Sequence, residues 1–130
     1  MRNLVATVSV AFLLSACALF PSYFDYNEQA RLVDIIELTK TDAVCATDEI
    51  KSVSRDIRQK TDWLITYSSS LPDNVKIQEM NKQLSDIVGD FDRRYQTDKP
   101  PSKFFCSAKI KNINEAARKM LSVSGRRPRA

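Results

Sequence analysis

The sequence contains no histidine and only two glycines, and nowhere do apolar and polar residues alternate as they do in a half-buried strand. Without histidine there is no ordinary general base at neutral pH, and neither a Ser-His-Asp nor a Cys-His catalytic arrangement can form. Thiols without histidine also make a poor metal site, and no glycine-rich phosphate-binding loop is present. These absences argue against an enzyme, and we expect no metal and no other cofactor.

The N-terminal segment is the most informative part of the chain. Arg2 is the only charge ahead of an apolar run of 11 residues, at positions 4–14, and small residues follow the run. This order of charge, short apolar region and small residues is the layout of a secretory signal, and 11 apolar residues are too few to span a bilayer. We therefore expect residues 1–16 to be a signal peptide that is removed.

Residues 14–17 read Leu-Ser-Ala-Cys. They resemble the lipobox of bacterial lipoproteins, formed here by Leu14, Ser15, Ala16 and Cys17. The resemblance implies that the chain is cut before Cys17, that its sulfur carries a diacylglyceryl group, and that its new amino terminus is acylated, for instance with palmitate. Each buried CH2 contributes about 0.8 kcal/mol, so a cysteine carrying three acyl chains is a stable membrane anchor.

The residue after the lipobox cysteine bears on location. In Gram-negative lipoproteins an aspartate there favours retention in the inner membrane, and this chain has Ala18. The resemblance thus implies the outer membrane, with the protein facing the periplasm. A Gram-positive host would place it on the outer side of its single membrane.

The charge is unevenly distributed. The net charge of +4 equals the contribution of four arginines, one in the signal and three near the C-terminus, so residues 17–125 are formally neutral. A neutral body argues against a nucleic-acid-binding face. The three C-terminal residues, which can contact anionic lipid, cell-wall carboxylates or an acidic partner, are Arg126, Arg127 and Arg129. A disordered, solubilising end is the alternative for this segment.

Helical periodicity dominates the rest of the chain and predicts an all-α fold. One apolar stripe runs through residues 32–71, and shorter stripes follow at residues 77–95 and 106–120. Ser102 is suited to cap the last helix, and Gly125 to end it. We predict four parts: a signal peptide at 1–16, a lipidated tether at 17–26, one helical bundle domain at 27–125 and a basic tail at 126–130.

Two cysteines remain once Cys17 is assigned to lipid. In an exported protein they predict a disulfide between Cys45 and Cys106, with free thiols or an intermolecular bridge as alternatives. If the helix turns near Cys45, where Thr47 and Asp48 are good cap residues, four helices of about 20 residues form an antiparallel bundle with both cysteines at one end.

If the helix instead continues, a three-helix body carries an apolar stalk at residues 25–45, which needs a partner or a second copy. We favour the compact bundle, in which the arginines return towards the membrane. Among the aromatic residues, Trp63 and Tyr67 are predicted at the edge of the core, and Phe104 and Phe105 around the disulfide. The aromatic residues expected in the membrane interface are Phe20, Tyr23, Phe24 and Tyr26.

The overall layout resembles two groups of small lipoproteins. One is encoded by tailed bacteriophages: a lipobox, a Leu-Phe-Pro spacer, a helical body with two cysteines and a basic end. The other is the pilotins of type II secretion, outer-membrane helical bundles with one disulfide that bind a helix of the secretin. We expect a membrane-anchored, non-enzymatic adaptor or pilot for an envelope protein. The alternative is a phage-encoded envelope lipoprotein acting in host lysis, like an outer-membrane spanin, or in superinfection exclusion.

Overall fold

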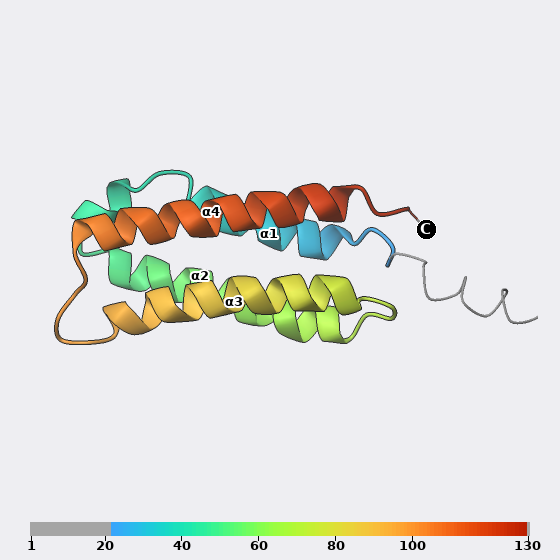
Figure 1. Ribbon diagram of the computed structural model, residues 1–130, viewed down its shortest axis with the longest axis horizontal. Helices are drawn as coiled ribbons and strands as arrows, with labels where there is room; N and C mark the ends of the chain where they lie inside the picture. The colour runs from blue at the N-terminus through green and yellow to red at the C-terminus, as the bar shows by residue number, and fades with distance from the viewer. Residues whose placement is uncertain (1–21, 130) are drawn as a thin grey trace, which may run out of the picture.

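Four α-helices make up most of the computed structural model, which describes residues 22–129 (Figure 1). Their bounds are α1 (Tyr26–Leu38), α2 (Ile50–Ser69), α3 (Val75–Tyr95) and α4 (Lys103–Gly125), and a short 3-10 helix, η2 (Ala43–Ala46), lies between α1 and α2. This part of the chain contains no strand, so the predicted all-α fold is confirmed. The predicted signal peptide, the residues that resemble a lipobox, including Cys17, and Phe20 lie outside the described residues.

The chain turns near Cys45, and the compact bundle is therefore the correct alternative. Asp25 caps the start of α1 by accepting a hydrogen bond from the backbone N–H of Glu28 at 2.9 Å. At its other end the hydroxyl of Thr39 donates to the carbonyl of Ile35 at 2.7 Å. Because such side-chain bonds compete with helix continuation, α1 stops after 13 residues, well short of the predicted length.

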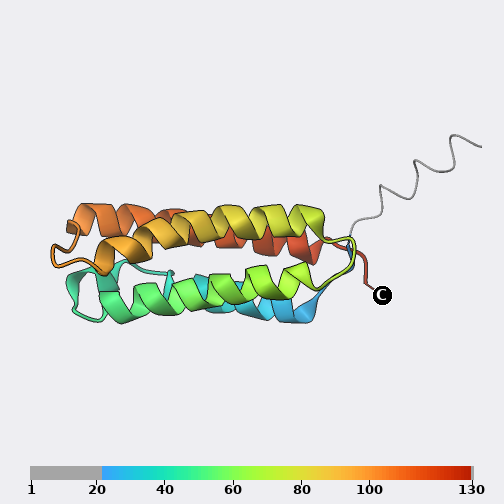
Figure 2. The same cartoon turned by 90° about the horizontal axis from the view of Figure 1, so that it is seen from below.

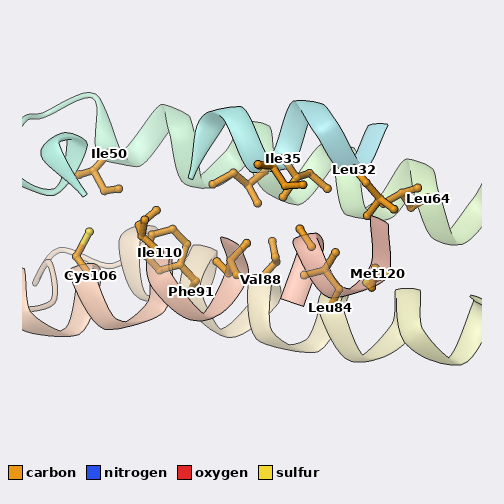
Figure 3. Packing of buried hydrophobic residues seen from close by; sticks show 14 of the residues in the cluster. Leu32, Ile35, Ile50, Leu64, Leu84, Val88, Phe91, Cys106, Ile110 and Met120 are labelled. Atoms are coloured by element: carbon orange, nitrogen blue, oxygen red, sulfur yellow. The ribbon is translucent and has the colours of Figure 1, made fainter. Parts of the chain in front are cut away.

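The predicted disulfide is confirmed. Cys45, in η2, is bonded to Cys106, in the first turns of α4, with their Cα atoms 5.8 Å apart. The side chain of Cys106 is fully buried at one end of the core (Figure 3). The bond therefore ties the α1–α2 connection to α4 at the end of the bundle opposite residues 22 and 129, the ends of the described chain (Figures 1 and 2).

The core follows the predicted stripes, with one addition on α2. Apolar residues alternate there with small polar ones, so that Ser54, Thr61 and Ser68 are buried as completely as their apolar neighbours. Each of these hydroxyls donates to a backbone carbonyl of its own helix. Small, internally satisfied side chains allow α2 and α3 to pack closely, and these two helices make the most extensive contact in the bundle.

The described residues contain no helix long and apolar enough to cross a membrane.

Candidate functional site

Both ends of the described chain meet at one end of the bundle (Figures 1 and 2). The backbone N–H of Phe24 donates to the carbonyl of Pro128 at 2.8 Å. The guanidinium of Arg129 lies over the ring of Phe24, 4.7 Å from its centroid. The C-terminal segment thus runs beside the segment that leads back to Cys17, as the compact bundle predicts.

A buried ion pair holds this end together. The side chain of Glu28 is 1% exposed and that of Arg127 is 5% exposed. One Arg127 Nη atom donates to Glu28 Oε2 at 2.5 Å and to Ser124 Oγ at 2.8 Å. The other donates to Ser22 Oγ at 3.1 Å and to Asn74 Oδ1 at 3.3 Å. We call Glu28, Arg127, Asn74, Ser124 and Ser22 the polar clamp, because they join α1, α4, the α2–α3 turn and the N-terminal segment.

The polar clamp corrects one sequence-based prediction. Arg127 was expected in a free basic tail, but the structure buries it, so it is not available to an anionic surface. The physical reason is Glu28, a carboxylate on the buried face of α1, which requires a paired cation. The sequence contains an indication that Glu28 is buried, because Glu28 lies four residues before the core residue Leu32 and therefore on the same helix face. Arg126 and Arg129 are exposed.

Exposed apolar side chains surround the clamp. Tyr23, Tyr26 and Val75 are three of the five large hydrophobic residues that are exposed in the described chain, and all three lie at this end of the bundle. Lys76, next to Val75, is also exposed. This end therefore presents apolar and cationic side chains together, a combination suited to a membrane interface.

An open groove starts near the same end and runs between α3 and α4. Its volume is about 420 Å³, within the range of ligand-binding pockets. Its floor is apolar, with Met80 and Ile87 from α3 and Ala116 and Val123 from α4. The remaining lining residues are Lys76, Gln83, Leu84, Lys119 and Met120. No carboxylate lines it, and its two charged residues are lysines.

Beyond the groove, towards the disulfide end of the bundle, side-chain contacts between α3 and α4 close the seam between these two helices. Lys109 Nζ lies 2.8 Å from a carboxylate oxygen of Asp90, and its hydrogen bond to this carboxylate lowers the pKa of Asp90 below 3.8. The guanidinium of Arg94 lies 5.3 Å from the centroid of the Phe105 ring. The sequence does not predict the groove, because its position depends on where the contacts between α3 and α4 stop.

A second hollow lies near the disulfide and has a volume of about 540 Å³. Its wall carries both signs of charge, including Lys40, Asp42, Lys111 and Glu115, so it has no charge preference. Phe104 lines it and is 85% exposed, which corrects the prediction that it packs around the disulfide.

Two other aromatic predictions are confirmed. Phe105 is half-buried against the core, and differs from Phe104 because adjacent residues on a helix point in different directions. Trp63 also lies at the edge of the core, stacked on Tyr67 with a centroid distance of 4.5 Å. The hydroxyl of Tyr67 donates to Asp25 at 3.0 Å, so this pair supports the cap of α1.

Across residues 22–129, no three or more potential ligand side chains gather into a metal site. Comparison with models of known protein families, with curated proteins and with solved structures finds no match.

Proposed function

We propose that the protein is a lipid-anchored lipoprotein of the cell envelope, held by Cys17 on the periplasmic face of the outer membrane, and that it acts as a non-enzymatic adaptor. In this proposal the α3–α4 groove holds a segment of another envelope protein. The observation that carries the proposal is the open apolar groove next to the end of the bundle where Phe24 and Pro128 meet.

The distance from Cys17 supports a membrane-proximal position for this end. Five residue steps separate Cys17 from Ser22, and they can span at most about 17 Å. The polar clamp and the start of the groove then lie close to the lipid surface. The bundle presents a partner's binding surface at membrane level, as an adaptor requires.

The exposed side chains at this end support a direct membrane contact. Tyr23 and Tyr26 are suited to the headgroup region, and Arg126 and Arg129 to anionic headgroups. Replacing both arginines with glutamine should weaken binding to anionic vesicles by about 2 kcal/mol, since each cation contributes about 1 kcal/mol. The protein for this assay carries Cys17→Ser, and the matched control is Lys51→Gln/Lys103→Gln, which changes two exposed lysines at the opposite end of the bundle. Equal binding by both variants would rule out the contact.

Photo-crosslinking in living cells tests the adaptor role. A photoreactive residue replaces Lys119, at the edge of the groove, or Arg118, its exposed neighbour outside the groove. We expect one envelope protein, identified by mass spectrometry, to be captured from position 119 and not from position 118. The capture should disappear when Ala116→Trp fills the groove, while the protein stays in the membrane fraction.

The same experiment has outcomes that contradict the adaptor role. Capture of only lipid, or of only a second copy, from position 119 would reject it. Such a result would favour the alternative of a phage-type lipoprotein that acts by self-association or on the membrane.

A further inference from the structure

The shape of the groove specifies the kind of segment it can hold. Its lining residues on α3 extend from Lys76 to Ile87, a length of about 16 Å at 1.5 Å per residue. This corresponds to about three turns of a helix laid along the groove. An apolar floor between two helices is filled by apolar side chains at i, i+3 or i+4, and i+7 of an amphipathic helix.

The floor can adapt to such a helix. Met80 and Met120 contribute flexible thioether side chains, which fit apolar surfaces of varied shape. The small side chain of Ala116 leaves the space between the two helices open. Insertion of a partner's apolar side chains therefore requires rotamer changes rather than separation of α3 from α4.

The charges at the groove edges specify the partner further. Lys76 and Lys119 are exposed, and within residues 22–129 neither lies within 4.0 Å of a carboxylate. In the closed part of the seam between α3 and α4, Lys109 from α4 is paired with Asp90 from α3. The groove has lysines at its edges but no carboxylate in its lining to pair with them.

Resting on the adaptor proposal, we infer that the groove binds an amphipathic helix of a partner protein whose apolar stripe is flanked by carboxylates. The apolar stripe fills the floor between α3 and α4. The carboxylates pair with Lys76 and Lys119, which fixes the orientation of the helix and disfavours basic helices.

Two designed peptides test this inference. Both are helical, about 15 residues long, with the same Leu and Ile stripe. One carries Glu at the flanking positions and the other carries Lys. The full-length protein is placed in nanodiscs of zwitterionic lipid, and peptide binding is measured by fluorescence anisotropy, with empty nanodiscs as background. We expect the Glu peptide to bind at least about tenfold more tightly than the Lys peptide, with a ratio that falls as salt screens the charges.

Charge reversal on the protein provides the decisive comparison. Lys76→Glu/Lys119→Glu should invert the preference between the two peptides. The matched control is Lys82→Glu/Lys111→Glu, which changes two exposed lysines on the same helices outside the groove and should leave the preference unchanged. All four substitutions are on exposed helix positions, and circular dichroism checks that each variant is folded.

Several outcomes would overturn the inference: equal binding of both peptides, binding of neither, a preference for the Lys peptide, or a preference that survives Lys76→Glu/Lys119→Glu. If adding more of the same protein, with no other partner, displaces the Glu peptide, the groove would be assigned to self-association instead. These failures are distinguishable from failure of the adaptor role. If position 119 still captures one envelope protein in cells, the adaptor role stands and only the acidic character of the partner is wrong.

Discussion

Arg127→Met removes the charge from the polar clamp while keeping most of the buried aliphatic stem. Glu28 would then be an almost fully buried carboxylate with only the side-chain amide of Asn74, at 3.1 Å, as its remaining side-chain donor in the clamp. Removal of one partner from a buried ion pair lowers the free energy of unfolding by about 3–5 kcal/mol, because the other charge is left buried and unpaired. A small domain has a total of about 5–15 kcal/mol, so this variant should be marginally stable.

The assays are equilibrium unfolding in denaturant and thermal unfolding, both followed by circular dichroism with the disulfide intact. At about 4–8 °C per kcal/mol, the melting temperature of Arg127→Met should fall by about 12 °C or more. Adding Glu28→Gln should restore most of the loss, since a neutral amide can keep the Asn74 contact without an unpaired charge. Arg126→Met, at the exposed neighbouring position, is the control and should change stability by about 0.5 kcal/mol or less.

The comparison of the two arginine variants can refute this reasoning. If Arg127→Met has no larger effect than Arg126→Met, the ion pair does not hold the end of the bundle together, and the basic segment is a free tail after all. If Arg127→Met is destabilising but Glu28→Gln does not restore stability, the loss comes from packing of the arginine stem and not from the unpaired carboxylate.

Three further predictions concern the anchor, the disulfide and the closed part of the α3–α4 seam. Cys17→Ala should release the folded protein into the soluble periplasm; a variant that still pellets with membranes after salt and carbonate washes would contradict lipid anchoring. Cys106→Ser should lower the free energy of unfolding by about 2–4 kcal/mol, given the 61-residue separation of the two cysteines. Reductant should lower the melting temperature of the unmodified protein but not that of the Cys106→Ser variant. Because Lys109 lowers the pKa of Asp90 below 3.8, their pairing stabilises the fold above pH 3.8 and is lost as the pH falls through the folded-state pKa. Lys109→Met should therefore raise the pKa of Asp90 in an NMR titration and reduce stability at pH 7 by less than about 1 kcal/mol, since the Asp90 side chain is 37% exposed; an unchanged titration would contradict the pairing.

Local signals in the sequence predicted most of the fold. Ser102 caps α4 by accepting a hydrogen bond from the N–H of Phe105, and α4 ends at Gly125, both as predicted. The disulfide was inferred from the number of cysteines together with the predicted export. Asn74 shows the limit of such signals: it is the N-cap residue of α3, yet its side chain makes no capping bond and instead contacts Glu28 and Arg127. The Asn74 side chain could have capped α3, but it binds the buried charged groups of Glu28 and Arg127, which are distant in sequence.

The groove was unpredictable for a related reason. The apolar residues of α3 and α4 were assigned to the core by periodicity alone, and periodicity does not separate Leu84, which is buried, from Met80, which is only half-buried. That difference depends on the distance between two helices. Ala116 lines the groove on α4, and beyond the groove Lys109 pairs with Asp90 across the two helices; the repeat of neither helix predicts these features.

The two ends of the bundle are held by different means, and this bears on the groove between them. The disulfide fixes α4 to the α1–α2 connection at one end, and the polar clamp fixes α4 to α1 and to the start of α3 at the other. Because α4 is held at both ends, its position relative to α3 is restrained, and the groove is open in the structure. We therefore expect the groove to be preformed, so that a partner helix that enters it avoids the free-energy cost of opening the bundle. In the proposed function, such a preformed site would lie near the membrane end of the protein, which is the arrangement expected for an adaptor.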